Sequence, residues 1–338
     1  MTNESNYLLK LDMPSAASGE RQLFTSKFNS LTLIEKWREL PTSTNIQAFT
    51  ARAAVAVHNA RVLDLCCGTG KGSIELVNNW SVGEVVYIDQ SSVALEMAQE
   101  VFKNSARSSL VSTRFVCQSA ELLDNVEDLG MFDTIIIRYA LHLVSDPVTL
   151  LSRLYHRLRP GGRIVFNLAG SNIFRFCDPS FNAIPDSSGR AHPFFLAVYR
   201  AALILREEIL SAVPRDEQES VLLTETKANG GTNETYCINY PIGTQFDLRA
   251  IREIVVRAGI PLSKFSYEVT WLRASFEDKA AYASVLGAPP IPKIWQLFNA
   301  MHPSHRNELV QKVMRVAGES LPASSRFYFP EPIFTIYN

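Results

Sequence analysis

Two acidic residues and a small-residue turn are the groups in this sequence best placed to bind a ligand. An apolar run ends in Asp64 and leads directly into a turn that contains Cys66, Gly68 and Gly70. A buried parallel strand followed by such a turn is typical of nucleoside-binding folds, because glycine lets the backbone approach a ligand closely. Asp89 comes 25 positions after Asp64. An acid at that point can bind ribose hydroxyls, although the turn and the acid could also serve only packing and helix capping.

Three further side chains could act as acids or bases. His142 lies just beyond the expected fourth strand, at the sheet end where open α/β folds bind ligands, and imidazole titrates near neutral pH. His192 and Tyr240 lie in or beside a later segment that is rich in aromatic residues. Each of the three could instead serve packing. The adjacent thiols of Cys66 and Cys67 are better interpreted as packed side chains than as nucleophiles.

The sequence around these residues alternates strands and helices. Strands are expected at 61–65, 84–88, 114–117, 133–137 and 163–168. Helices are expected at 72–79, after a cap at Ser91 or Ser92, and at 147–158, the last ended by the PGG sequence at 160–162. This succession predicts a parallel sheet that is covered by helices on both faces.

The alternation stops after residue 170 and resumes near residue 247. A helix is expected near 193–213, and the later segments predict a helix at 247–258, a strand at 265–273 and a short closing strand at 333–337. Before 60, helices are expected at 24–40 and 46–57. Residues 276–325 are interpreted as mostly helical, with Ser304 as a possible cap for a helix at 307–317.

Composition limits the classes of protein and partner. The 338 residues are 46% hydrophobic and 20% charged, as in globular proteins, and the net charge of −1 favours neither nucleic acid nor a membrane surface as a partner. No apolar run is long enough to span a bilayer, and the first ten residues lack a signal-peptide pattern. Five cysteines without a CxxC pair predict reduced thiols, no metal site and a cytoplasmic protein.

Five short motifs follow one another between residues 50 and 170. They are 62–70 (VLDLCCGTG), 86–89 (VYID), 119–121 (SAE), 132–142 (FDTIIIRYALH) and 158–165 (LRPGGRIV). In order and spacing they resemble the motifs of class I S-adenosylmethionine-dependent methyltransferases of the small-molecule type. The resemblance implies a Rossmann-like, doubly wound, seven-stranded and mostly parallel sheet with helical cap insertions, and S-adenosylmethionine as the cofactor.

The resemblance also implies a role for each matching residue. Asp64, Cys66, Gly68 and Gly70 would hold the methionine part of the cofactor, Asp89 the ribose, Ser119 and Ala120 the adenine, and Arg138 the sulfonium side. Gln90 is a further cofactor-binding candidate. Tyr139 would line the cleft beside Arg138, so that the candidate catalytic residues are His142, Tyr139, His192 and Tyr240.

Two residues depart from the family pattern. Cys66 replaces the usual first glycine of the turn, so the backbone there is expected to adopt a conformation that tolerates a β-carbon. Ser119 replaces a frequent aspartate and is expected to be a weaker acceptor for the adenine amino group.

The predicted organisation has four parts. They are an N-terminal arm with lid helices (1–58), the S-adenosylmethionine-binding core (59–170), a substrate cap (171–240) and the rest of the core with a helical insertion at about 276–325 (241–338). The expected function is in-line methyl transfer to a small-molecule acceptor, in specialised metabolism, within a capped cleft.

Three alternatives stay open at this point. An enzyme of this fold could consume the cofactor without methyl transfer, for example by cyclising its aminobutyl arm. It could methylate a macromolecule, or it could be a non-catalytic binding module. A base is needed only if the acceptor is a poorly ionised hydroxyl or an acidic carbon, and the sequence does not indicate the acceptor or the oligomeric state.

Overall fold

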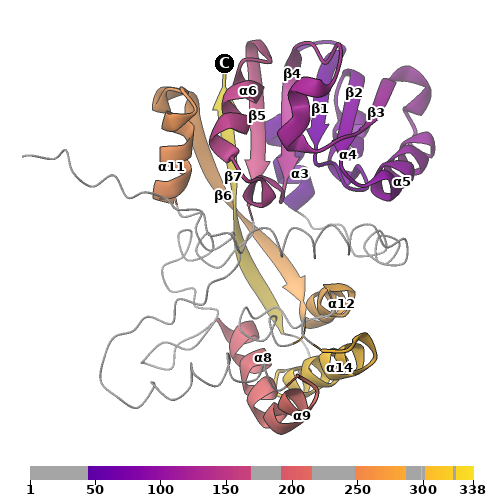
Figure 1. The fold of residues 1–338 in the computed structure, drawn as a ribbon, viewed down its shortest axis with the longest axis vertical. Helices are drawn as coiled ribbons and strands as arrows, with labels where there is room; N and C mark the ends of the chain where they lie inside the picture. The colour runs from indigo at the N-terminus through magenta and orange to yellow at the C-terminus, as the bar shows by residue number, and fades with distance from the viewer. Residues whose placement is uncertain (1–44, 169–191, 215–247, 287–297, 299–300, 323–324) are drawn as a thin grey trace, which may run out of the picture.

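One sheet organises the part of the chain that the computed structural model describes, which comprises residues 45–168, 192–214, 248–286, 298, 301–322 and 325–338. Its strands are β1 Ala60–Leu65, β2 Val82–Asp89, β3 Ser112–Cys117, β4 Phe132–Arg138, β5 Leu158–Asn167, β6 Phe265–Ser275 and β7 Arg326–Tyr337. They form the order β3-β2-β1-β4-β5-β7-β6 (Figure 1). The strands β1 to β5 pair in parallel, whereas β7 runs antiparallel to β5 and β6. The predicted doubly wound, seven-stranded sheet is confirmed.

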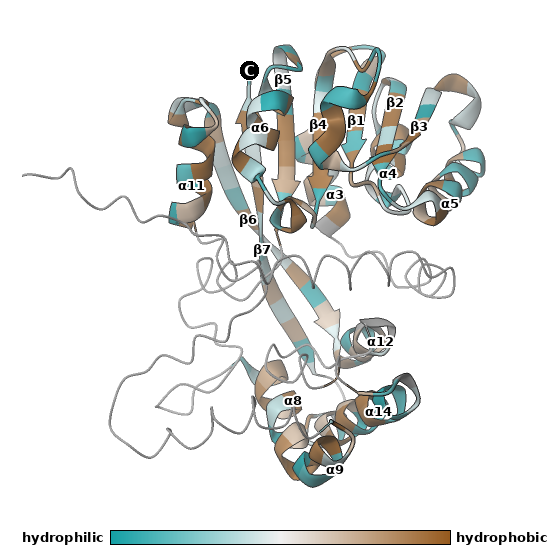
Figure 2. Ribbon diagram, viewed as in Figure 1, coloured by the Kyte–Doolittle hydropathy of each residue, from teal (hydrophilic) through white to brown (hydrophobic). Residues whose placement is uncertain are grey.

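Helices cover both faces of this sheet. They are α3 Asn45–Ala53, α4 Lys71–Asn79, α5 Ser92–Lys103, α6 Pro147–Tyr155 and α11 Leu248–Arg257, with short 3-10 turns at η1 Ser108–Leu110, η2 Ala120–Asn125, η3 Leu141–Leu143 and η4 Leu262–Lys264. On β4, Ile135 and Ile137 pack with α6 and α11, while Ile136 packs with α3, α4 and α5 on the opposite face. Because successive side chains of a strand alternate between faces, a strand buried on both sides is apolar along its length. Figure 2 shows this in the central strands.

A second group of helices packs at the far end of the antiparallel β6–β7 pair. These helices are α8 Pro193–Ile204, α9 Arg206–Ser211, α12 Phe276–Leu286 and α14 Pro303–Glu319. They bury an apolar cluster, here called the cap cluster, whose members include Phe194, Val198, Leu272, Val310, Phe327 and Phe329. In Figure 1 the parallel strands run down towards these helices. The helix expected near 193–213 and the helical insertion at 276–325 therefore pack together.

Several predicted boundaries are wrong. The closing strand begins at Arg326 rather than at 333, because Phe327 and Phe329 are buried in the cap cluster, beyond the part of β7 that pairs with β5. The helix before β5 ends at Tyr155, and the PGG sequence lies inside β5, which starts at Leu158. His302, not Ser304, caps the helix that begins at Pro303.

Other expectations are met or lie outside the described residues. Ser91 caps α5, since its hydroxyl accepts a hydrogen bond of 3.2 Å from the Ala94 N–H. The helix expected at 46–57 is α3, which packs on the sheet through Phe49 and Ala53. The helix expected at 24–40 and most of the predicted cap, including Tyr240, lie outside the described residues.

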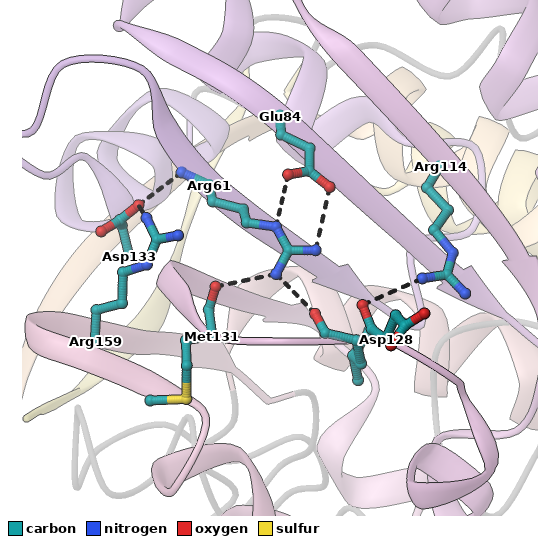
Figure 3. Close-up of polar contacts among 8 residues, drawn as sticks. Arg61, Glu84, Arg114, Asp128, Met131, Asp133 and Arg159 are labelled. Atoms are coloured by element: carbon teal, nitrogen blue, oxygen red, sulfur yellow. Dashed lines mark hydrogen bonds and ion pairs between the residues drawn. The ribbon is translucent and has the colours of Figure 1, made fainter.

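A polar network holds the amino ends of four strands together, β1, β2, β4 and β5. The Arg61 guanidinium at the start of β1 binds both carboxylate oxygens of Glu84 on β2, at 2.6 and 3.2 Å (Figure 3). The Asp133 carboxylate on β4 accepts hydrogen bonds of 2.8 Å from the Arg61 N–H and from the Arg159 guanidinium. These charges lie at the edge of the sheet opposite to the small-residue turn, so their role is structural.

The two glycines of the PGG sequence are expected to respond differently to alanine. A β-carbon on Gly162 would lie 2.9 to 3.1 Å from the carbonyl oxygens of Arg159, Asp133 and Phe132, which the strand pairing holds in place. Gly161 has a φ of 77° but open space around it. We expect Gly162→Ala to cost about 3 kcal/mol or more in urea unfolding, and Gly161→Ala only about 1 kcal/mol of backbone strain. Equal losses would contradict the packing at Gly162.

Candidate functional site

The turn after β1 takes a left-handed backbone at every second residue. The φ angles are 55° at Cys66, 53° at Gly68 and 72° at Gly70. A β-carbon on Gly70 would lie 3.1 Å from the Tyr87 ring and 3.3 Å from the Ala98 side chain, whereas one on Gly68 would meet nothing within 4 Å. Gly70 is therefore required for packing, and Gly68 leaves the backbone accessible to a ligand.

Cys66 adopts the backbone conformation that favours glycine. The sequence predicts a conformation that tolerates a β-carbon, and the φ of Cys66 lies in the left-handed region, which residues other than glycine enter only at an energetic cost. The reason lies in the residues that follow, because the Cys67 N–H donates to the Ile88 carbonyl at 3.1 Å and the Gly68 N–H donates to Asp89 Oδ2 at 2.8 Å. These bonds draw the turn towards the end of β2. Burial raises the pKa of both thiols, as expected for packed cysteines that are not nucleophiles.

Asp89 ends β2 and supports the turn directly. Its Oδ2 accepts the Gly68 N–H, and its Oδ1 accepts the Ser91 N–H at 2.9 Å. Burial raises the pKa of this half-buried carboxyl, and the backbone hydrogen bonds oppose that shift. An ionised carboxylate has about four acceptor positions, so Asp89 can also bind ligand hydroxyls. Gln90, the next residue, is exposed.

Asp64 lies under the turn rather than on its surface. It is 2% exposed, and its Oδ2 accepts a hydrogen bond of 2.6 Å from the Ser73 hydroxyl in the first turn of α4. Burial raises the pKa of Asp64 to about 6, against the lowering effects of Ser73 and the Arg138 guanidinium. The carboxyl is thus poised to ionise or to take up a proton close to neutral pH.

Arg138 brings a positive charge to the end of β4. Its guanidinium carbon lies 5.7 Å from the centroid of the Phe49 ring on α3 and 5.8 Å from that of Tyr139. A β-carbon on Gly72 would lie 2.7 Å from Arg138 Cδ, so glycine leaves room for the side chain beside α4. The Arg138 Nε is buried and has no hydrogen-bond partner among the residues that the structure describes. Such a donor is suited to an anionic ligand group.

Ser119 and Ala120 follow β3 at the same edge of the sheet. The Ser119 hydroxyl accepts the Glu121 N–H at 3.3 Å and caps η2, and Ala120 is 7% exposed. The serine oxygen is therefore partly engaged by the protein, which agrees with its predicted weakness as an acceptor. All nine residues predicted to bind the cofactor thus lie at the carboxyl edge of strands β1 to β4.

The predicted general base, His142, is buried in η3. The side chain is 9% exposed, and burial lowers its pKa to about 4. The imidazole is neutral at pH 7, and its low pKa makes it a weak base.

Tyr139 is held in place at both ends. Its backbone is left-handed, with a φ of 49°, and its N–H donates to Asn167 Oδ1 at 2.9 Å. Its hydroxyl donates to Glu331 Oε1 on β7 at 2.7 Å. A strained backbone that is fixed by buried polar groups is typical of functional sites.

His192 is half-buried and packs against two phenylalanines of the cap cluster. Its ring centroid is 5.0 Å from that of Phe329 and 5.6 Å from that of Phe195, and its Nε2 lies 3.3 Å from the Tyr328 carbonyl oxygen. These contacts are those of a packed ring. The structure does not group His192 with the residues of the turn after β1.

Glu331 was missed in the sequence analysis. The side chain is 7% exposed and contacts Tyr139. A signal was present, because Phe327, Phe329, Glu331 and Ile333 alternate along one strand with a single acid among apolar residues. The signal was lost because the predicted strand began at 333.

The described residues contain neither a metal-binding cluster nor a membrane-spanning helix. Across the described ranges, no group of three or more His, Cys, Asp or Glu side chains is arranged to hold a metal ion. Among the helices whose residues are described, none is long and apolar enough to cross a membrane.

The chain resembles known methyltransferases in sequence over part of its length. A family model described as a methyltransferase domain matches residues 62–162. Demethylmenaquinone methyltransferase of Lactococcus lactis subsp. lactis (strain IL1403) is 34% identical over 105 residues, which make up 31% of this chain and 40% of that protein. Malonyl-(acyl-carrier protein) O-methyltransferase of Paenibacillus sp. (strain JDR-2) is 25% identical over 178 residues, or 52% of this chain and 56% of that protein. The chain thus spans about half the length of these curated relatives.

Several solved structures align with most of the chain at low similarity. The plantazolicin methyltransferase BpumL covers 96% of this chain with 97% of its own, at a TM-score of 0.47 and 14% identity.

Proposed function

We propose that the protein is a class I S-adenosylmethionine-dependent methyltransferase that acts on a small-molecule acceptor, starting from the methyltransferase-domain model that matches residues 62–162. The observation that carries the proposal is the joining of the turn after β1 to Asp89 through the Gly68 N–H, at the point where the strand order reverses. Open α/β sheets bind ligands at such a point.

The residues at this edge fit S-adenosylmethionine. Asp89 offers acceptors for the ribose hydroxyls, and Ser119 and Ala120 follow β3, on the side expected for the adenine. Asp64 supplies a negative charge that suits the ammonium group of the methionine part. The buried Arg138 Nε suits its carboxylate better than the sulfonium side first expected, because two cations repel.

S-adenosylmethionine supplies an electrophilic methyl group. The protein's part is to orient the acceptor and to exclude water. The helices of the cap cluster and the antiparallel β6–β7 pair are consistent with a cap beyond the carboxyl ends of the parallel strands. A cap of this kind agrees with an organic acceptor in specialised metabolism, and the curated relatives are named for a demethylmenaquinone and for malonyl-(acyl-carrier protein). Among the described cysteines, Cys66, Cys67 and Cys117 are free thiols, which supports a cytoplasmic location.

Calorimetry tests the proposal. We expect one molecule of S-adenosylmethionine or its demethylated product, S-adenosylhomocysteine, to bind per chain, and the absence of binding would refute the function. Incubation with S-adenosylmethionine alone separates methyl transfer from cyclisation, since only a cyclising enzyme releases methylthioadenosine without an acceptor.

A further inference from the structure

Glu331 lies where the sheet meets the cap cluster. On β7, Ile333 pairs with Asn167, the last residue of β5, so Glu331 lies two residues beyond the carboxyl edge of that strand. Residues that alternate along a strand share a face. On this face Phe327 and Phe329 belong to the cap cluster and Ile333 to the core of the sheet, so the acid separates two apolar clusters.

One oxygen of this carboxylate has a partner and the other does not. Oε1 accepts the Tyr139 hydroxyl at 2.7 Å. Oε2 is buried and has no hydrogen-bond partner among the described residues. A buried acceptor without a donor is unfavourable, and such atoms in folded proteins usually have a water or ligand partner. The Oε2 atom can therefore accept a hydrogen bond from a group that the described residues do not supply, such as a water molecule or a ligand hydroxyl.

The surrounding charges limit the kind of donor. Burial raises the pKa of Glu331, while Tyr139, Lys279 and Arg138 lower it, so two cationic side chains lie near enough to stabilise the carboxylate. They would repel a third cation, such as a protonated amine. A neutral hydroxyl can donate to Oε2 without this repulsion.

The neighbouring side chains are aromatic. Tyr139 contacts the carboxylate itself, and Phe329, two residues away on the same strand face, has the Lys279 ammonium 4.1 Å from its ring centroid. Aromatic rings pack favourably against a flat apolar ligand.

We propose that Glu331, held by Tyr139, binds the hydroxyl group of a neutral phenolic acceptor through Oε2. That the bound phenol is a methyl acceptor rests on the proposed function. The binding of the phenol itself can be tested without methyl transfer. Glu331 is thereby assigned as a binding residue that determines which class of molecule is accepted.

The test measures the binding of 4-nitrophenol to the full chain loaded with S-adenosylhomocysteine, followed by the absorption of the phenol. The buffer is held about one pH unit below the pKa of this phenol, so that most of the probe is neutral and carries its O–H donor. The variant is Glu331→Gln, which keeps an oxygen for the Tyr139 hydroxyl but sets an N–H₂ donor against the phenol. We expect its affinity for the phenol to fall about tenfold or more, the usual effect of losing a hydrogen bond to a charged group. The matched control is Glu208→Gln, the same change at an exposed carboxylate that pairs with Lys312, and it should leave the affinity unaltered.

A second probe isolates the hydroxyl. 4-Nitroanisole lacks the donor, so wild type and Glu331→Gln should bind it equally weakly. The proposal is overturned if wild type does not bind 4-nitrophenol, if both glutamine variants lose affinity equally, or if the two probes respond alike. A titration with S-adenosylhomocysteine alone separates the two hypotheses. If that compound binds and the phenol result is negative, only the acceptor site fails, whereas the absence of nucleoside binding refutes the proposed function.

Discussion

Replacing Asp89 with alanine is expected to weaken the binding of S-adenosylhomocysteine about a hundredfold or more, because hydrogen bonds to a carboxylate contribute about 1.5–3 kcal/mol each. Under the proposed function the carboxylate accepts the ribose hydroxyls. It also accepts the Gly68 N–H, so its loss should remove a ligand contact and loosen the turn. Calorimetry at pH 7 measures the change in affinity.

Two further variants make this result specific. Asp89→Asn keeps one oxygen for the Gly68 N–H and should lose less affinity than the alanine variant. Glu84→Gln alters a carboxylate at the other end of the same strand, where it pairs with Arg61, and should bind the nucleoside like wild type. Wild-type affinity in Asp89→Ala, or an equal loss in Glu84→Gln, would contradict the role of Asp89.

The second large effect concerns pH and acts with opposite sign on binding and on stability. Burial raises the pKa of Asp64 from 3.8 in the unfolded chain to about 6 in the ligand-free protein. The native state therefore holds this proton more tightly than the unfolded chain does. The stabilising contribution of Asp64 to the native state is fully present below about pH 4 and is lost as pH rises through 6. At about 1.4 kcal/mol per pKa unit, the loss in free energy of unfolding is about 3 kcal/mol.

Asp64→Asn should accordingly make the ligand-free protein more stable at pH 8 than wild type, by up to about 3 kcal/mol, with little difference at pH 4. The asparagine oxygen can still accept the Ser73 hydroxyl. Binding should change in the other direction. Only the ionised carboxylate attracts the ammonium group of S-adenosylhomocysteine, so the wild-type affinity should fall up to about tenfold per pH unit below 6.

Urea unfolding and calorimetry between pH 4 and 8 measure both effects on the same variant. The nearby charges of Arg138 and Asp89 are common to wild type and variant, so the difference between them isolates Asp64. An asparagine variant that is less stable than wild type at pH 8, or an affinity that does not vary with pH, would contradict the assignment.

The sequence alone determined the features whose causes are local. A strand buried on both faces is apolar along its length, so β1 and β4 were recognisable in the sequence. The turn from Cys66 to Gly70, the cap at Ser91 and the spacing to Asp89 depend on neighbouring residues. Together with the alternation of strands and helices they predict the parallel sheet and the edge at which we propose that the cofactor binds.

Contacts and burial that involve residues far apart in the sequence became visible only in the three-dimensional structure. Glu331 meets Tyr139 across 192 positions of the chain, because β7 is inserted beside β5. The burial of His142, which weakens it as a base, and the packing of His192 among phenylalanines come from elements that are remote in sequence. Burial and pairing across such separations follow from the three-dimensional packing of strands and helices, and no local pattern of residue types specifies them.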